Sequence, residues 1–104
     1  MSLRYVDEKL FVAVLGMARS QDSLQDRLMG AWLNFHTLQD RDLPEGDLRD
    51  QFQEITHALT WREAKGDEGT VRATTSQMSD QEASGFIEKI VSLYAEVAEQ
   101  AARL

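Results

Sequence analysis

Apolar residues recur along most of this chain at steps of three and four, the spacing of one face of an α-helix. The pattern is widest in the second quarter of the chain. The residues that share one face there are Leu24, Leu28, Ala31, Trp32, Phe35 and Leu38. Met29 and Leu33 point nearly the opposite way. A helix that is apolar on two sides cannot bury both against one neighbour, so this segment is predicted to be central to a bundle or to an oligomer.

A preceding helix is predicted over about residues 3–18. Its main apolar face consists of Leu3, Val6, Leu10, Ala13, Val14 and Met17, broadened by Phe11 and Ala18. Val12 and Leu15 lie on the far side, so this helix also carries apolar side chains in more than one direction. A short polar break, with Asp22 or Ser23 as the N-cap, joins it to the next helix, and the two are therefore predicted to be antiparallel neighbours.

The second half of the chain predicts two more helices. Pro44 suits the first position of the third helix, where a missing N–H costs nothing, and Lys65-Gly66 is a typical helix end. The apolar face of this helix is Leu48, Phe52, Ile55 and Leu59. The fourth helix begins at a capping box, Ser79 to Glu82. Its apolar face is Ala83, Phe86, Ile87, Ile90, Val91, Tyr94, Val97, Ala98 and Ala101.

The longest connection lies between Gly66 and Ser79. Its β-branched residues are compatible with a short extended piece or with a single helical turn, and we predict an ordered loop that crosses the bundle. The fold class is therefore all-α, with residues 1–104 as a single domain. The simplest architecture is an up-down-up-down four-helix bundle with a long loop between helices three and four.

Composition narrows the function classes. The formal net charge is −7 and the basic residues are scattered, which argues against a nucleic-acid partner. The chain has no cysteine, which excludes disulfides, thiolate nucleophiles and cysteine-ligated metals. The uncharged run from Leu10 to Ala18 is too short for a bilayer, which needs about 20 residues, and no basic stretch precedes it. We therefore expect a cytoplasmic protein with no membrane partner.

The motifs that resemble sites of chemistry are incomplete. Glu54-x-x-His57 has the spacing of a di-iron ligand pair, but it occurs once and on the polar side of its helix. Asp40-x-Asp42 fails as a calcium loop because the glycine and glutamate that such a loop needs are missing. No nucleophile or carboxylate occurs at a spacing from His36 that would indicate a catalytic pair. No catalytic residue, metal or cofactor is predicted.

The first two helices carry more apolar surface than one four-helix core of this size readily absorbs. We therefore expect a homodimer that buries either the side with Met29 and Leu33 or the side with Val12 and Leu15. Trp61 is either an exposed binding residue beside His57 or a ring covered by the long loop. The candidate interface residues are Val12, Leu15, Met29, Leu33, His36, His57 and Trp61.

Four blocks, at residues 23–28, 43–49, 66–74 and 78–83, are similar to blocks of small uncharacterised bacterial all-helical proteins. They are SLQDRL, LPEGDLR, GDEGTVRAT and MSDQEA. The resemblance covers most of the chain and brings no activity, ligand or catalytic residue with it. It implies only that the segment between Gly66 and Ser79 is a surface on which another protein docks.

These observations predict a non-enzymatic, acidic helical accessory protein that self-associates and docks on a larger protein through an apolar helix face. The alternative is a small-ligand binder or an enzyme, with a pocket between helices near Trp32, Phe35 and His36.

Overall fold

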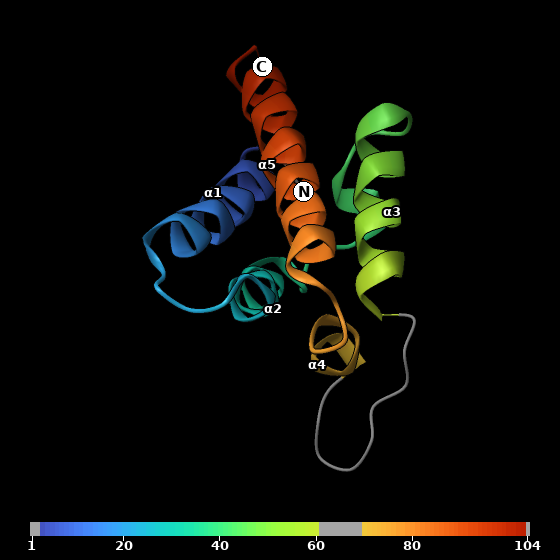
Figure 1. Cartoon of the computed structure of the whole chain (residues 1–104). Coiled ribbons are helices and arrows are strands. Elements are labelled where there is room, and N and C mark those ends of the chain that lie inside the picture. The colour runs from blue at the N-terminus through green and yellow to red at the C-terminus, as the bar shows by residue number, and fades with distance from the viewer. Residues whose placement is uncertain (1–2, 61–69, 104) are drawn as a thin grey trace.

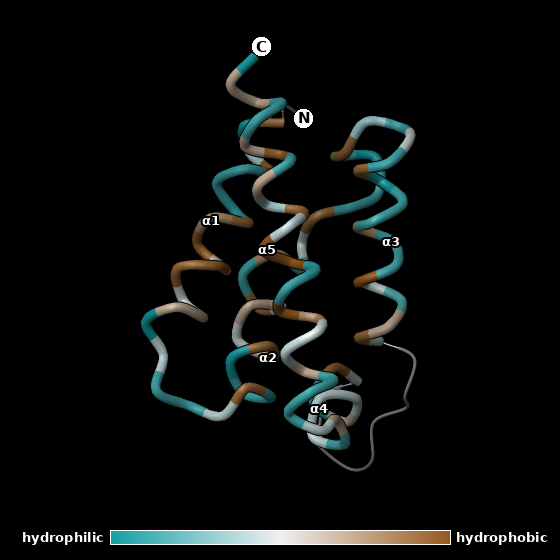
Figure 2. The backbone as a smooth tube through the Cα atoms, turned by 45° about the horizontal axis from the view of Figure 1, so that its top comes forward, coloured by the Kyte–Doolittle hydropathy of each residue, from teal (hydrophilic) through white to brown (hydrophobic). Residues whose placement is uncertain are grey.

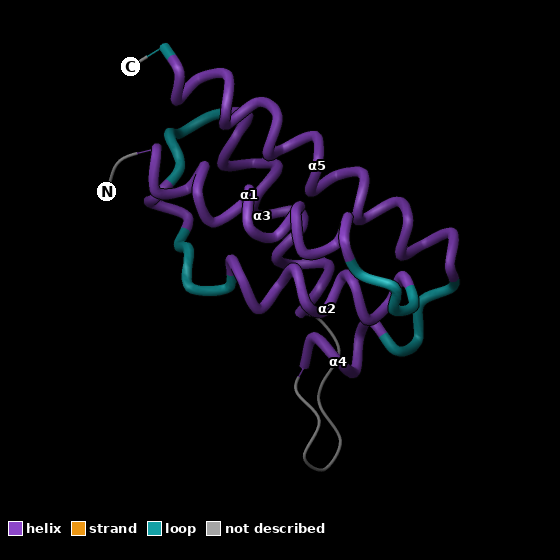
Figure 3. Tube along the Cα trace, turned by 90° about the vertical axis from the view of Figure 1, so that its left-hand side faces the viewer, coloured by secondary structure: helices purple, strands orange, loops and turns teal. Residues whose placement is uncertain are grey.

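The computed structural model describes residues 3–60 and 70–103 of the chain, and all regular structure within these ranges is helical (Figures 1 and 3). The elements are α1 (Leu3–Arg19), α2 (Leu24–Phe35), the 3₁₀ turn η1 (Asp40–Asp42), α3 (Asp47–Thr60), α4 (Thr70–Thr75) and α5 (Asp80–Ala102). The predicted all-α class is confirmed for these residues. The four long helices α1, α2, α3 and α5 correspond to the four that the hydrophobic pattern predicts.

Helix α5 lies between α1 and α3 and packs against α1, α2 and α3 (Figure 1). The start of α1 and the end of α5 lie at the same end of the molecule, so these two helices are antiparallel (Figure 2). Helix α2 contacts α1, α4 and α5, which agrees with its predicted central place. In Figure 1 α2 is seen nearly along its axis while α5 runs up the picture. In Figure 3, which shows the molecule from the side, α2 and α5 both run across the picture, so α5 is foreshortened in Figure 1 and the two helices do not cross steeply.

The core follows the predicted stripes closely. The buried residues of the long helices are Val6, Leu10, Ala13 and Met17 on α1, Leu28, Ala31 and Phe35 on α2, Leu48, Phe52, Ile55 and Leu59 on α3, and Ala83, Ile90, Leu93, Val97 and Ala101 on α5. The prediction for the last helix needs one correction. Leu93, which it leaves out, is buried, whereas Val91, which it includes, is exposed. Helix α5 packs against three other helices. Their positions decide which of its residues are buried, and this set differs from the one that periodicity alone predicts.

The predicted start signals of two helices are present. Ser23 caps α2, and its hydroxyl accepts a hydrogen bond from the Asp26 N–H at 3.1 Å. At the start of α5 the Ser79 hydroxyl accepts from the Glu82 N–H at 3.1 Å, and the Ser79 N–H donates to the Glu82 carboxylate at 3.1 Å. These bonds satisfy backbone N–H groups that a helix leaves without an internal partner at its first turn.

Two predicted boundaries are wrong. The apolar pattern predicts that the second helix runs to about Leu38 or Gln39, but α2 ends at Phe35, although the Leu38 side chain is still buried. Helix α3 begins at Asp47 and not at Pro44, because the turn before it passes through Gly46 at a φ of 114°, which no helix residue adopts. The predicted end of the third helix at Lys65-Gly66 lies outside the described residues.

The predicted ordered loop contains a short helix. Thr70–Thr75 form α4, which packs beside α2 and α3 (Figure 3). Val71, Ala73, Thr74 and Thr75 are buried, and the Thr74 hydroxyl donates to the Thr70 carbonyl at 2.9 Å. Of the alternatives that the sequence leaves open here, the helical turn is the observed one. Burial of these side chains against α2 and α3 stabilises a helix that would be too short by itself.

Candidate interaction surface

The side of α1 that faces away from the core carries three large apolar side chains. Phe11, Val12 and Leu15 are 49%, 48% and 43% exposed, respectively. We call these residues the α1 outer face. Helix α1 packs against α2 and α5 with the opposite side, on which Leu10 and Ala13 are fully buried. Figure 2 shows the middle turns of α1 as hydrophobic, although this helix lies at one side of the molecule.

The α1 outer face continues onto α5. The ring centroids of Phe11 and Tyr94 lie 6.1 Å apart at an interplanar angle of 46°. Val91 precedes Tyr94 by about one helical turn and is also exposed. Val12 and Leu15 lie on the side away from the core, as the sequence predicts, and the structure adds Phe11 to this side. The predicted place of Phe11 in the broadened buried face of this helix is wrong, because its ring contacts Tyr94 while the residue stays 49% exposed.

Glu8 and Arg19 are the charged residues on this side of α1 nearest to the two ends of the apolar face. Glu8 and Arg19 are exposed, and the residues of α1 between Lys9 and Arg19 are uncharged. Within residues 3–60 and 70–103, neither Glu8 nor Arg19 forms an ion pair. Neither residue is among the interface candidates that the sequence predicts. A helical projection of the far side of α1 would have found them, because they lie on the same side as Val12 and Leu15.

A second apolar area lies between α2 and α4. Met29, Trp32 and Leu33 line an open hollow there. Thr60, Thr70 and Val71 complete its walls. Leu33 is 59% exposed, as expected for an interface residue, but Met29 is partly buried against the core. His36 lies beside this area, with its ring centroid 6.1 Å from that of Trp32.

The remaining candidates lie elsewhere. His57 lines a small polar hollow with Asp40, Gln53 and Thr56, between η1 and α3. Trp61 lies outside the described residues. The predicted interface residues therefore do not form one surface. Val12 and Leu15 share one face, Met29, Leu33 and His36 share another, and His57 belongs to neither.

The acidic residues of the candidate metal motifs make structural contacts. Glu54 pairs with Lys89, with 2.6 Å between Nζ and Oε1. Asp42 accepts a hydrogen bond from the Gln39 N–H at 2.8 Å and so caps η1. Among the described residues, no group of three or more His, Asp or Glu side chains is placed to hold a metal ion.

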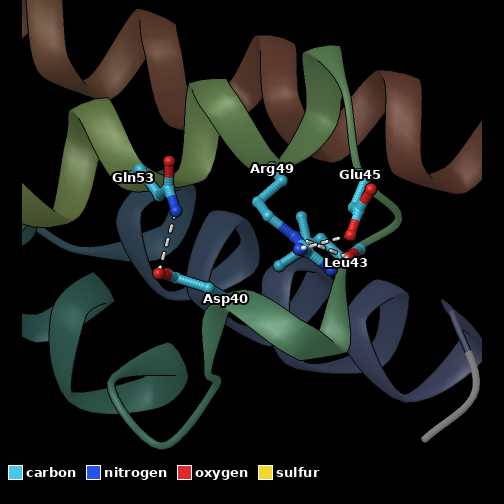
Figure 4. A network of polar contacts seen from close by, with 5 residues as sticks. All are labelled: Asp40, Leu43, Glu45, Arg49 and Gln53. Atoms are coloured by element: carbon cyan, nitrogen blue, oxygen red, sulfur yellow. Dashed lines mark hydrogen bonds and ion pairs between the residues drawn. The ribbon is translucent and has the colours of Figure 1, made fainter.

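Figure 4 shows the polar contacts that connect η1 and the loop after it to α3. The Gln53 amide donates to the Asp40 carboxylate at 2.9 Å, and the Arg49 guanidinium donates to the Leu43 carbonyl through Nε at 3.1 Å and Nη2 at 2.7 Å (Figure 4). Arg49 Nη1 also lies 3.7 Å from a carboxylate oxygen of Glu45. These contacts provide hydrogen-bond partners for polar groups of η1 and of the loop that follows it. The polar residues of this segment therefore have a structural role.

The residues of the alternative ligand pocket are partly packed against each other. The Phe35 ring lies 5.5 Å from the Trp32 ring and 6.5 Å from the Phe52 ring between centroids, and Phe35 is 1% exposed. Phe35 is therefore a core residue, while His36 is exposed, with its ring centroid 6.1 Å from that of Trp32.

Comparisons of the chain with protein-family models, with curated proteins and with solved structures give no significant match. The resemblance to small bacterial helical proteins stays a prediction. None of the helices within residues 3–60 and 70–103 is long and apolar enough to cross a membrane.

Proposed function

We propose that this protein is a non-enzymatic interaction protein that self-associates through the α1 outer face. The observation that carries the proposal is the exposure of Phe11, Val12 and Leu15 together on one side of one helix. Exposed apolar residues scattered singly are ordinary, whereas a contiguous group is typical of an interaction site. A second copy that covers the group removes apolar surface from water. This burial favours association by about 25 cal/mol for each Å² of apolar surface.

The α1 outer face is a better dimer surface than the area around Leu33. The hollow beside Leu33 is lined in part by the hydroxyl-bearing side chains of Thr60 and Thr70. The α1 outer face is uncharged over its length and is extended by Tyr94. A face built mainly on one helix is small beside the roughly 800 Å² per partner that stable interfaces bury. We therefore expect a micromolar dissociation constant.

Docking on a larger protein, a cytoplasmic location and a bacterial source stay predictions of the sequence. The small-ligand alternative gains no specific support, because Phe35 is part of the packed core.

The test is sedimentation velocity from low to high micromolar concentration. We expect the wild-type protein to shift from monomer to dimer and Leu15→Asp to stay monomeric. The matched control is Leu33→Asp, which introduces the same change at a leucine that is more exposed and lies on another side. We expect Leu33→Asp to dimerise like the wild type.

Both leucines are outside the core, so we expect both variants to fold. Circular dichroism checks this and distinguishes a dissociated variant from an unfolded one. A wild-type protein that stays monomeric at high micromolar concentration would overturn the proposal. So would a Leu15→Asp variant that dimerises normally. A monomeric Leu33→Asp beside a dimeric Leu15→Asp would move the interface to α2.

A further inference from the structure

The structure points to a particular geometry for this association: α1 of one copy pairs antiparallel with α1 of a second copy about a two-fold axis. This inference rests on the proposed function and adds the identity and orientation of the partner element. It comes from the placement of Glu8 and Arg19 relative to the apolar residues between them.

Glu8 and Arg19 lie on the same side of α1. They are spaced by about three helical turns, so both project from the side that carries Val12 and Leu15. Both are exposed, and neither has an ion-pair partner among the described residues. The face thus has a negative charge at one end, a positive charge at the other and apolar side chains in the middle.

The charged pair and the apolar pair share one centre. The midpoint of Glu8 and Arg19 along α1 coincides with the midpoint of Val12 and Leu15. A two-fold axis through this point places Glu8 opposite Arg19 of the second copy, and Val12 beside Leu15 of the second copy. A two-fold interface requires this kind of self-complementarity, in which residue i contacts residue j and residue j contacts residue i.

Packing in this arrangement is also favourable. Phe11 of each copy falls over Leu15 and Ala18 of the other, where the small alanine side chain leaves room for the ring. A parallel pairing would place Glu8 opposite Glu8 and Arg19 opposite Arg19, and like charges that face each other across an interface are unfavourable. The antiparallel arrangement is therefore the one that the charges select.

Charge reversal tests the orientation. In the antiparallel dimer, Glu8→Arg replaces two attractive pairs with two repulsive ones, and Arg19→Glu does the same. We expect each variant to weaken dimerisation about tenfold at low salt, and the double variant E8R/R19E to restore it. Arg72→Glu on α4 and Glu88→Arg on α5 are matched controls, because they carry the same charge changes at exposed positions away from α1. We expect no change in dimerisation for either control.

A distance measurement gives an independent answer. The chain has no cysteine, so Arg4→Cys introduces a single attachment point for a spin label near the start of α1. The antiparallel dimer separates the two labelled backbone positions by about 30 Å, whereas a parallel dimer brings them within about 10 Å. Pulsed dipolar spectroscopy detects the longer separation, and dipolar broadening of the continuous-wave spectrum detects the shorter one.

The outcomes separate this inference from the proposed function. If Leu15→Asp dissociates the dimer while the single charge reversals have no effect or the labels lie close together, the antiparallel geometry is wrong and the α1 interface stands. If the double variant fails to recover the affinity that the single variants lose, the pairing of Glu8 with Arg19 is wrong. If the wild-type protein never dimerises, both proposals fail.

Discussion

The Phe11 ring rests against the Tyr94 ring, with 6.1 Å between the centroids, while about half of the Phe11 side chain stays exposed. Tyr94 itself packs against the core. The contact therefore holds an exposed aromatic ring in place before any partner arrives. An ordered side chain loses less conformational entropy on binding than a free one, so this contact favours association through α1.

Truncation of two phenylalanines should separate the core from the surface. Phe35→Ala removes a ring that is 1% exposed and lies between the rings of Trp32 and Phe52. We expect the free energy of unfolding to fall by about 3–5 kcal/mol because of lost burial and the cavity left behind. Urea unfolding monitored by circular dichroism measures this value.

Phe11→Ala is the matched control for the core substitution. Because its ring is half exposed, we expect a loss below about 1.5 kcal/mol, together with weaker self-association. Equal destabilisation by the two variants would contradict the assignment of Phe35 to the core and Phe11 to the surface.

The capping box of α5 should contribute measurably to stability. Ser79→Ala removes the hydroxyl that accepts from the Glu82 N–H, and we expect a loss of about 1 kcal/mol. Ser84→Ala, at an exposed position inside the same helix, should be neutral or slightly stabilising, because alanine is the better helix former there. Thermal unfolding of the two variants gives the comparison. A capping effect requires Ser79→Ala to be the less stable of the two.

Two glycines should respond to alanine in opposite directions. Gly46 has a φ of 114°, so we expect Gly46→Ala to cost about 1–2 kcal/mol through backbone strain. Gly85 lies inside α5 with open space where a Cβ would be built, so Gly85→Ala should stabilise the protein by about 0.5–1 kcal/mol. Chemical denaturation measures both. A stabilising Gly46→Ala would mean that the turn before α3 is built differently.

The ion pair between Lys89 and Glu54 should contribute little to stability. It joins α5 to α3 at 2.6 Å, but both side chains are about half exposed. We expect a coupling energy below about 1 kcal/mol in a double-mutant cycle of Lys89→Ala and Glu54→Ala, and a smaller one at high salt. A coupling of several kcal/mol that persists in high salt would show that this contact is shielded from water.

Local features of the fold could be predicted from the sequence with good accuracy. The cap at Ser23 and the capping box at Ser79 depend on groups only three residues apart, so neighbouring residues suffice to identify them. All buried residues of α3 can also be predicted from the sequence, because one face of that helix is apolar and the other polar. The boundary at Pro44 was missed, since proline suits several turn positions and the deciding feature is the backbone conformation of Gly46.

The candidate surface could be predicted only in part. The sequence shows that α1 and α2 carry apolar residues on two sides, and from this it follows that one core cannot bury all of them. It does not show which side a neighbour covers. Met29 is partly buried against the core and lines a hollow together with residues of α4, while Val12 and Leu15 stay exposed on the outer side of α1.

The sequence by itself determined the helices, because their periodicity, caps and apolar faces are properties of residues a few positions apart. Only the tertiary structure decided which apolar faces stay exposed, because burial depends on how the helices pack, and residues distant in the chain set that packing. The place of α1 at one side of the molecule and the packing of α2 and α5 against its inner side are decided in this way (Figure 1). They leave Phe11, Val12 and Leu15 at the surface, between Glu8 and Arg19.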